Sequence, residues 1–528
     1  MQNNIVVNNI SFEPTDDFFV LKNISVSFGE KKIGLVGNNG TGKTVLLKLL
    51  VGEIEPTVGK IQRIGKIAYL PQDYQIDLKK TVGEALEIVD KLKALEKIKN
   101  GDKNESLLEI VGDDWDIYNR AVEKLEYFNL HNIDFNRRLE TLSGGEKVKI
   151  ILAKLLIAKP DFIILDEPTN NLDQVSREIV YNLVKNWKQG LLVVSHDRGL
   201  LNLFDQIYEL SEGSLKLYGG NYDFYKEQKE IENQSVKRQL GDAKKHFKKV
   251  KKQAEKTLEQ QQKRAESGKK RRDKLGMGKT ELDLMKDSSE TTTSRLSKSH
   301  DKIINEAKEK LELAKDKIAP ENLIVADLSG TNVPEGKLII GMKDTSFSYG
   351  DKKIFENFNL SIYGPKRLAI EGVNGSGKTT LIKLMLQILK PDSGEVQIGV
   401  KRFAYLDQNF TILDKEKDIL ENIKQISKIN ESLARDWLAK FMFKSDNIFK
   451  KVKVLSGGER MRAALACILA GEEPPQLLIL DEPTNNLDLN SIEQIESVLL
   501  NFEGALIVVS HDKKFLENIG VDENLMLI

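Results

Sequence analysis

Two glycine-rich loops, each ending in Gly-Lys-Thr, are the strongest candidates for a binding and catalytic site in this chain. Both follow an apolar run and open a stretch typical of a helix. Amide N–H groups of such a turn can surround a phosphate, and the lysine can pair with its β and γ oxygens. We predict two ATP sites, with the Thr44 and Thr379 hydroxyls as Mg²⁺ ligands. The first loop is Gly37, Asn38, Asn39, Gly40, Thr41, Gly42, Lys43 and Thr44, and the second is Gly372, Val373, Asn374, Gly375, Ser376, Gly377, Lys378, Thr379 and Thr380.

A pair of carboxylates follows an apolar run in each half of the chain. Asp166 and Glu167 come after Ile-Ile-Leu, and Asp481 and Glu482 come after Leu-Ile-Leu. A carboxylate at the end of a strand beside a phosphate loop can hold Mg²⁺, and the next one can orient or deprotonate the attacking water. We therefore predict that the two aspartates are metal ligands and that the two glutamates are catalytic.

Two more polar pairs repeat at matching positions. His196 and His511 each lie 30 residues after the aspartate, in the context Val-Val-Ser-His-Asp, and are expected to contact the γ-phosphate. Gln72 and Gln408 lie 29 and 30 residues after the loop lysines and fit a side chain that contacts both metal and γ-phosphate. Because both halves keep every catalytic residue type, we predict two hydrolytic sites. For the aromatic side chain that stacks on the adenine, base stacking and core packing are both open at Phe12, Phe18 and Tyr349.

Short apolar runs ahead of glycine turns must position these side chains. Such runs are typical of buried parallel strands, and helical stretches such as TVLLKLLVGE separate them. The fold class that follows is α/β, with two P-loop domains that are each large enough to bury a core. We predict a first domain over residues 1–225, a linker over 226–335 and a second domain over 336–528. The expected strands are KKIGLVG, FIILDEP and LLVVSHD in the first domain and KRLAIEG, LLILDEP and LIVVSHD in the second.

The segment between the two halves lacks a strand pattern but carries heptad periodicity. Apolar residues recur at steps of three and four from Val236 to Leu258, and again from Ile304 to Ile318. Neither helix can bury its stripe alone, so we predict an antiparallel hairpin of two helices with a non-helical tip between about Glu266 and Thr293. The first helix should be about 50 Å long. A solvated spacer is the alternative, since runs of charge usually mark solvated faces.

Charge is concentrated in this linker. The formal net charge of the chain is zero, yet residues 237–286 contain 18 Lys or Arg against 7 Asp or Glu. A basic, extended hairpin suits a polyanion such as RNA, which lysine and arginine bind through salt-dependent phosphate contacts. Aromatic residues are nearly absent from the tip, so base stacking is not the expected mode. The candidate RNA contacts are Lys269, Lys270, Arg271, Arg272 and Lys274.

Composition excludes several classes of protein. The single cysteine, Cys467, can form neither an internal disulfide nor a zinc site, and its apolar context predicts a core position. No apolar run approaches the roughly 20 residues that a membrane-spanning helix needs, and the N-terminus lacks a basic region followed by an apolar stretch. We interpret the chain as a cytoplasmic protein without a membrane domain.

Paired LSGGE and LDEPTNNLD motifs, tandem phosphate loops and a helical linker resemble the ABC-F family over nearly the full chain. Members of that family are soluble ATPases that bind ribosomes at the tRNA exit site and push the interdomain linker toward the peptidyl-tRNA. The resemblance implies ATP and Mg²⁺ as cofactors, and the bacterial ribosome, with its rRNA and P-site tRNA, as partner. It also implies a monomer in which the two cassettes pair within one chain. A DNA partner is not expected.

The same resemblance assigns a role to LSGGE. In cassette ATPases the serine and the following amides cap the γ-phosphate of the nucleotide that the other domain holds. ATP would then join the two halves, and hydrolysis would release them. The first phosphate loop would share its nucleotide with Ser456, Gly457 and Gly458, and the second with Ser143, Gly144 and Gly145.

Two features favour the family members that protect ribosomes from large-subunit antibiotics over the housekeeping translation factors. The linker is long, and the first half is only modestly extended, with 71 residues from Gln72 to Ser143 against 48 from Gln408 to Ser456. Two other function classes are open: the ATPase subunit of a membrane transporter, in which the basic hairpin has no role, and a DNA-clamp ATPase. The latter would carry zinc-binding cysteines or far longer coiled coils.

Overall fold

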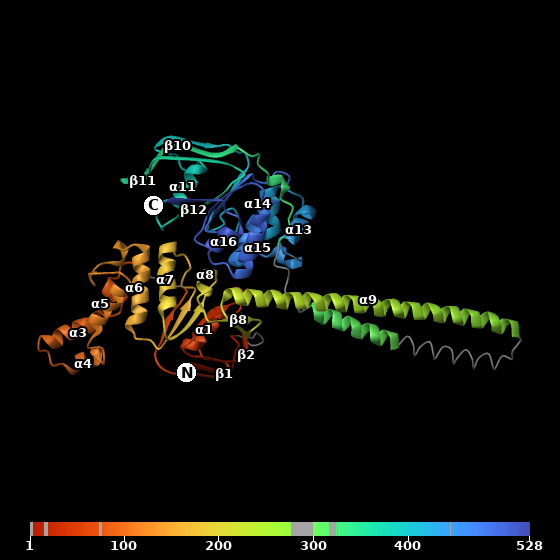
Figure 1. Ribbon diagram of the computed structural model, residues 1–528, viewed down its shortest axis with the longest axis horizontal. Coiled ribbons are helices and arrows are strands. Elements are labelled where there is room, and N and C mark those ends of the chain that lie inside the picture. The colour runs from red at the N-terminus through yellow and green to blue at the C-terminus, as the bar shows by residue number, and fades with distance from the viewer. Residues whose placement is uncertain are drawn as a thin grey trace. The chain divides into compact units, whose positions relative to one another are not determined.

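The computed structural model describes residues 4–14, 20–72, 77–275, 299–315, 324, 326–443 and 445–527. The chain divides into two compact units, of which one is formed by residues 1–223 together with 323–528 and the other by residues 224–322. The first unit contains two α/β domains, the first running from β1 to β9 and the second from β10 to β17, and the other unit is the helical linker (Figure 1).

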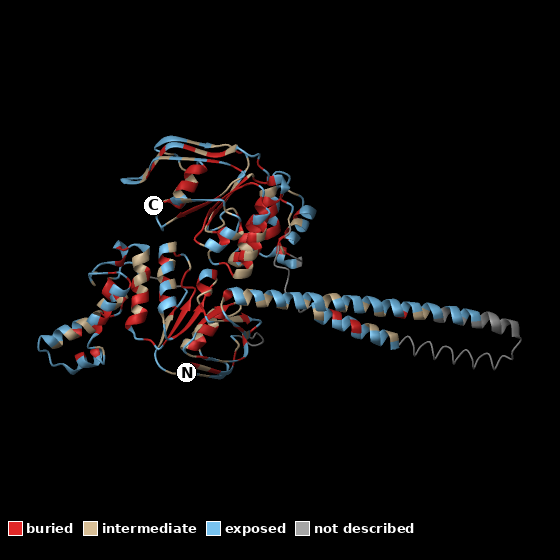
Figure 2. Cartoon of the chain, in the orientation of Figure 1, coloured by how far each residue is buried: buried red, intermediate tan, exposed pale blue. Residues whose placement is uncertain are grey.

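The main sheet of the first domain has the strand order β5-β6-β7-β3-β8-β9. Strands β8 and β9 pair antiparallel, and the other neighbours pair parallel. Every residue of β6 and β7 is buried, which explains why these runs are continuously apolar (Figure 2). The strands are β3 (Lys32–Val36), β5 (Ile67–Leu70), β6 (Phe162–Asp166), β7 (Gly190–Val194), β8 (Gln206–Ser211) and β9 (Ser214–Gly219).

A small antiparallel sheet in the order β2-β1-β4 shares one apolar core with the main sheet. Its strands are β1 (Ile5–Phe12), β2 (Leu21–Phe28) and β4 (Val58–Arg63). Helix α1 begins directly after the first phosphate loop, where Gly42 has a φ of 96° and a Cβ would lie 2.5 Å from Val20. Only glycine fits this left-handed, crowded position.

The helices of the first domain include a pair, α3 and α4, in the stretch where this domain is longer than the second. These two helices pack on one another through Ala94, Leu107 and Val111. The helical segments are α1 (Lys43–Val51), α2 (Val82–Ala85), α3 (Val89–Lys99), α4 (Glu105–Val111), α5 (Ile117–Tyr127), η1 (Leu139–Thr141), α6 (Gly144–Ile157), α7 (Gln174–Asn186) and α8 (Arg198–Leu201).

The second domain repeats this plan. Its main sheet is parallel, in the order β14-β15-β16-β12-β17, and β11-β10-β13 form the antiparallel sheet. The strands are β10 (Lys337–Tyr349), β11 (Lys352–Gly364), β12 (Arg367–Gly372), β13 (Ser393–Ile398), β14 (Phe403–Leu406), β15 (Leu477–Asp481), β16 (Ala505–Val509) and β17 (Glu523–Leu527). The helical segments are η2 (Ser329–Thr331), α11 (Lys378–Met385), α12 (Ile419–Ser427), α13 (Glu431–Lys440), η3 (Ser445–Phe449), η4 (Val452–Val454), α14 (Gly457–Leu469), α15 (Leu489–Leu500) and α16 (Lys513–Asn518). Cys467 lies in the core of this domain on α14, as predicted.

The linker contains two helices that run antiparallel (Figure 1). One is α9 (Tyr222–Leu275), and residues 299–315 form the other. His246, Val250 and Ala254 of α9 line one cavity together with His300 and Ile303 of the second helix. The members of both predicted apolar stripes are buried or half-buried throughout, apart from Ile318, which is outside the described residues. The predicted helical hairpin is confirmed to this extent.

The first linker helix is longer than predicted. It has 54 residues and continues through Leu275, so it does not end near Glu266. At 1.5 Å per residue its length is about 80 Å instead of about 50 Å. The segment from Lys269 to Lys274 is therefore helical and not part of a non-helical tip, whereas the rest of that predicted tip, from residue 276 onward, is outside the described residues. Among the described residues, no helix combines the length and apolar character needed to cross a membrane.

Candidate functional site

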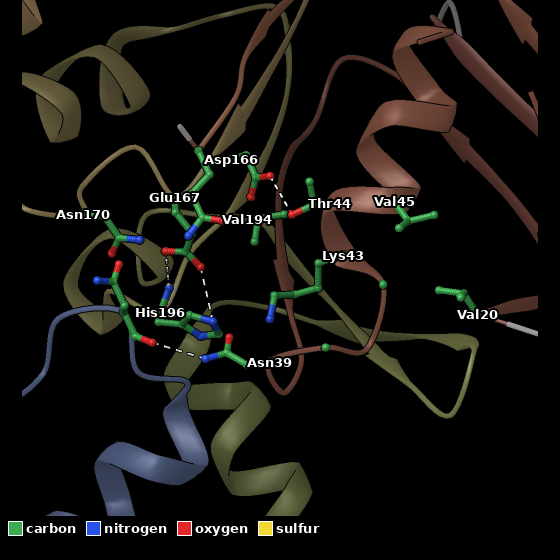
Figure 3. A pocket seen from close by; sticks show the side chains of 14 residues that line it. Val20, Asn39, Lys43, Thr44, Val45, Asp166, Glu167, Asn170, Val194 and His196 are labelled. Atoms are coloured by element: carbon green, nitrogen blue, oxygen red, sulfur yellow. Dashed lines mark hydrogen bonds and ion pairs between the residues drawn. The ribbon is translucent and has the colours of Figure 1, made fainter. Parts of the chain in front are cut away.

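The first phosphate loop opens a cavity of about 470 Å³ that brings together most of the residues predicted for the first ATP site (Figure 3). The loop, the carboxylate pair, the glutamine and the histidine all reach it. Five of the lining residues were not predicted from the sequence, and one of these, Asn486, belongs to the second domain; the other four are Val20, Val45, Asn170 and Val194. The cavity is lined by Val20, Asn39, Gly40, Gly42, Lys43, Thr44, Val45, Gln72, Asp166, Glu167, Asn170, Val194, His196 and Asn486.

Sheet order explains why residues so distant in the sequence meet. Strand β3 leads into the first phosphate loop, β6 ends at Asp166, and β7 leads to His196. These strands are neighbours in the order β6-β7-β3 and run parallel, so their carboxyl ends share one edge of the sheet. Strands β15, β16 and β12 place Asp481, His511 and the second phosphate loop in the same way.

A threonine and an aspartate form a matching pair in each domain. Thr44 Oγ1 donates a 2.9 Å hydrogen bond to Asp166 Oδ2, and Thr379 Oγ1 donates one of 3.0 Å to Asp481 Oδ2. A hydroxyl and a carboxylate converging on one point suit Mg²⁺, which usually takes one or two protein oxygens and completes its shell with phosphate and water. Among the described residues, no group of three or more His, Cys, Asp or Glu could hold a metal ion.

The loop lysines are held close to the carboxylates. Lys43 Nζ donates to the carbonyls of Gly37, at 2.6 Å, and Asn38, at 3.1 Å. Lys378 makes the equivalent bonds in the second loop. Burial lowers the pKa of both lysines, and the neighbouring acidic side chains oppose that shift. A partly desolvated ammonium group of this kind favours an anionic ligand.

Glu167 is buried and contacts the histidine of its own domain. Its Oε1 lies 3.2 Å from His196 Nε2, and its Oε2 accepts a 3.3 Å hydrogen bond from the His196 backbone N–H. Its backbone has a φ of 49°, a strained value for a residue with a side chain, and its N–H donates to Val194 O at 2.9 Å. Burial raises the pKa of Glu167 to about 8 and lowers the pKa of His196 to about 3. The direction of these shifts favours a neutral imidazole and a more basic carboxylate, which suits a general base.

The second site reproduces this arrangement with one difference. Glu482 Oε1 lies 3.2 Å from His511 Nε2, and burial brings their pKa values to about 7 and about 4. Tyr405 donates its hydroxyl to Asp481 Oδ2 at 3.3 Å. Among the described residues, the corresponding hydroxyl of Tyr69 has no hydrogen-bond partner. The two sites thus share their reacting groups but not every neighbour.

The two phosphate loops contact the opposite domain through the residues that follow the catalytic carboxylates. The backbone N–H of Asn39 donates to Asp488 Oδ2 at 2.9 Å, and that of Asn374 donates to Asp173 Oδ2 at 3.0 Å. The side chain of Asn39 also donates to Asn486 O, at 3.2 Å. The contributing stretches are Asn170–Asp173 and Asn485–Asp488, called here the NNLD segments. Sequence reasoning missed this contact, although the aspartate closing both repeats of LDEPTNNLD was a usable signal.

The LSGGE glycines lie against the NNLD segment in the second domain and against α7 in the first. Ser143 and Ser456 cap the N-termini of α6 and α14. A Cβ on Gly457 would lie 3.2 Å from Asn486 O, and one on Gly145 would lie 3.3 Å from Ser176 Oγ. Ser143 and Gly144 sit at the start of α6, and Ser456, Gly457 and Gly458 sit at the start of α14. The cavity wall supplied by the second domain is thus Asn486, with LSGGE directly behind it.

The remaining predicted residues differ in how close they come to the cavity. Gln72 lines it and lies exposed just beyond β5, and Gln408 lies in the matching exposed position just beyond β14 in the second domain. Phe12 packs against the core, and Phe18 is outside the described residues. Tyr349 is half exposed and has an edge contact with Phe347. Among the described residues that line the first cavity, the apolar side chains are Val20, Val45 and Val194, and none is aromatic.

Comparison with known proteins agrees with this geometry. The family model described as "ABC transporter" matches residues 21–170 and 355–485, which together are more than half of the chain. Over 552 residues the chain is 31% identical to ABC transporter F family member 5 of Arabidopsis thaliana, covering 95% of this chain and 72% of that protein. This chain belongs to the ABC-F family. As an ABC-F protein it binds and hydrolyses ATP.

Two further comparisons place this ABC-F protein among relatives. It is 30% identical over 532 residues to the energy-dependent translational throttle protein EttA of Escherichia coli strain K12, covering 95% of this chain and 88% of EttA. The archaeal ribosome recycling factor aABCE1, solved in complex with the ribosomal stalk protein aP1, aligns with a TM-score of 0.57 at 19% identity over 98% of this chain and 87% of that one. The latter likeness establishes the tandem-domain fold.

Proposed function

We propose that this ABC-F protein acts on the bacterial ribosome, where ATP-driven closure of the two cassettes moves the linker hairpin toward the peptidyl-tRNA. The observation that carries the proposal is the presence in one chain of two matching ATP sites and a 54-residue helix with many exposed basic side chains. Two relatives support it by name, one as a translational throttle and one as a ribosome recycling factor.

Each nucleotide would be shared between the two cassettes. The loop lysines and backbone amides bind the β and γ phosphates, and the NNLD contacts bring the opposite LSGGE motif to the γ-phosphate. Mg²⁺ would be held by Thr44, Asp166 and Gln72 in one site, and by Thr379, Asp481 and Gln408 in the other, and it would neutralise phosphate charge. Glu167 and Glu482 orient the attacking water and accept its proton, while His196 and His511 hold these carboxylates in place.

The linker supplies the contact with RNA. Basic side chains of α9 are exposed along its described length, among them Lys237, Lys245, Lys252 and Lys263. Such a row neutralises phosphates without reading sequence. The same helix continues through Lys269, Lys270, Arg271, Arg272 and Lys274, which remain our proposal for the RNA contact. The division at residues 225/226 and 335/336, the monomeric state and the cytoplasmic location belong to the same proposal.

Protection of the ribosome from large-subunit antibiotics is the specific role that we propose. Its support is the length of α9 and the small size of the α3–α4 pair in the first cassette. A housekeeping translation factor is the second candidate, favoured by the match to EttA along 88% of that protein. Expression in a susceptible bacterium separates the two, because protection predicts a higher inhibitory concentration of at least one large-subunit drug and the housekeeping role predicts altered elongation without it.

The first test is co-sedimentation with bacterial 70S ribosomes. A Glu167→Gln, Glu482→Gln double variant keeps the shape of both carboxylates but cannot accept a proton, so the ATP-bound closed form should accumulate and pellet with ribosomes. The matched control adds Lys43→Ala and Lys378→Ala, which remove the phosphate contacts and should abolish pelleting. Absence of ATP-dependent pelleting of the double variant at low salt would overturn the ribosomal assignment.

A further inference from the structure

A buried ion pair joins the two cassettes on one side only. Arg198 is the first residue of α8 and follows the Val-Val-Ser-His-Asp motif of the first cassette. Its Nη1 donates to Glu496 Oε1 at 2.7 Å and its Nη2 to Glu496 Oε2 at 3.3 Å, and Glu496 is on α15 of the second cassette. Arg198 is 4% exposed and Glu496 is 8% exposed. Asn518 also donates to Glu496 Oε1, at 3.1 Å. The pair is therefore desolvated and held in a fixed geometry.

At the two positions that correspond to Arg198 and Glu496 in the opposite cassettes, the chain has different residues. Lys513 follows the same motif in the second cassette, as Arg198 does in the first, and it is exposed. Tyr181 on α7 occupies the place that corresponds to Glu496 and donates its hydroxyl to Asp197 within the first cassette. The duplication that preserved the Asp, Glu, His and Lys residues of the two ATP sites did not preserve this contact.

Helix α8 also holds the start of the linker helix. The guanidinium of Arg198 is hydrogen-bonded to the hydroxyl of Tyr222, the first residue of α9, and Tyr222 is 4% exposed. The backbone N–H of Asp223, next in the helix, donates to Asn202 Oδ1 at 3.1 Å, and Asn202 caps the C-terminus of α8. Both ends of this short helix thus contact the first turn of α9, where unsatisfied N–H groups need partners.

The same short helix follows directly from the first ATP site. His196, two residues before Arg198, donates its backbone N–H to Glu167 and contacts the carboxylate through Nε2. A shift of Glu167 or His196 therefore has to move the chain that bears Arg198. Because a buried guanidinium is unfavourable without its carboxylate, separation of the cassettes must give Arg198 a new partner or expose it to water. Tyr222 would then lose its bonded partner.

We propose that α8, through Arg198 and Asn202, is the element by which the first ATP site sets the orientation of the linker helix, with Glu496 as the sensor of cassette closure. The coupling is one-sided, because α9 begins beside the first cassette's histidine motif and the second cassette carries Lys513 instead of arginine. Arg198, Asn202 and Glu496 are positioning residues in this proposal. They do not touch the nucleotide.

Two distances measured by pulsed electron spin resonance test the proposal without ribosomes. Spin labels on cysteines replacing Lys60 and Lys245, both exposed, report the linker relative to the first cassette. Labels replacing Lys60 and Lys390 report cassette closure. Native Cys467 is 1% exposed and should not react. Each pair is measured with and without ATP in the Glu167→Gln, Glu482→Gln background.

Three substitutions are then compared. Tyr222→Phe removes only the hydroxyl that Arg198 contacts, Glu496→Gln removes the charge of the partner, and Lys513→Gln is the mirror control. We expect ATP to shift both distances in the parent and in Lys513→Gln. In Tyr222→Phe the closure distance should still shift, while the shift of the linker distance should be lost or its distribution broadened. Glu496→Gln should reduce the ATP-dependent shift of both the closure distance and the linker distance.

Two results would overturn the proposal. One is a linker shift in Tyr222→Phe identical to that of the parent, since the hydroxyl contact would then transmit nothing. The other is loss of cassette closure in Tyr222→Phe, since α8 would then serve domain pairing and not the linker. Because the ribosome is absent, either result leaves the ribosomal assignment to its own sedimentation test.

Discussion

The two cassettes match at their reacting groups and diverge a short distance away. Glu167 and Glu482 contact their histidines at the same distance, 3.2 Å, in both domains. Eight residues beyond the aspartate of each NNLD segment, however, the first cassette has Tyr181 and the second has Glu496. The comparison indicates that the reacting groups are present in duplicate, whereas the Arg198–Glu496 pair has no counterpart at the corresponding positions. Four experiments test this difference.

The largest effect is expected at the catalytic carboxylates. Combining Glu167→Gln with Glu482→Gln should lower ATP turnover by a factor of about 10² to 10⁴, because general-base assistance contributes that much. Each single variant should keep part of the activity if the two sites work independently. Steady-state phosphate release measures this, and complete loss of turnover in either single variant would show that the sites are not equal and independent.

The next largest effect is expected at the Arg198–Glu496 ion pair, which has no counterpart at the corresponding positions of the opposite cassettes. Glu496→Leu leaves Arg198 buried without its carboxylate and should destabilise the protein by about 3 kcal/mol or more. Lys513→Gln, at the position that corresponds to Arg198, removes an exposed charge and should change stability by less than about 0.5 kcal/mol. Thermal unfolding followed by calorimetry distinguishes them. Adding Arg198→Met to Glu496→Leu should restore part of the loss, and equal melting temperatures for the two single variants would contradict the asymmetry.

A smaller and symmetric effect is expected at the NNLD aspartates. Asp173 caps α7 and Asp488 caps α15, and each also accepts an N–H from the opposite phosphate loop. Replacing either by alanine should cost about 1 kcal/mol of stability through the lost cap. Both variants should raise the KM for ATP to a similar degree, because the two cross-domain bonds are alike. Ser106→Ala, on the surface of α4, is a control that should change neither quantity.

The smallest effect concerns a second position at which the cassettes differ. Cys467 on α14 corresponds to Lys154 on α6, which pairs with Glu87 on the surface. Burial raises the pKa of the Cys467 thiol to about 12, so the reactive thiolate is scarce at any lower pH. Iodoacetamide at pH 8 should leave the folded protein unmodified and should modify it fully in denaturant, as mass spectrometry would show. Rapid alkylation of the native chain would mean that the α12–α14 core opens readily.

Most of the fold could be predicted because its main strands are fully buried. After a phosphate loop, the continuous apolar runs that end at Asp166 and Asp481 can only be buried parallel strands. The parallel order of the sheet then brings the carboxylates, the histidines and the loops together. The heptad stripes of the linker were equally readable. These features depend on local pattern and on the handedness of βαβ units, which the sequence encodes directly.

The errors and omissions have physical causes too. The predicted non-helical tip began near Glu266, where Ser267 and Gly268 weaken a helix, yet one glycine costs only about 1 kcal/mol within a helix, and the lysine- and arginine-rich run after it favours helix. The NNLD contacts and the Arg198–Glu496 pair join residues separated by about 200 to 450 positions. No local pattern reports such pairings, which depend on how the two domains dock.

The continuous helix α9 has a mechanical consequence. A single helix of 54 residues without a break acts as a stiff lever whose fulcrum is the pair Tyr222 and Asp223. With an arm of about 80 Å, a tilt of about 10° at that fulcrum displaces the far end of the arm by about 14 Å. A small rotation at the first turn of α9 therefore becomes a much larger displacement at the last turn of the helix.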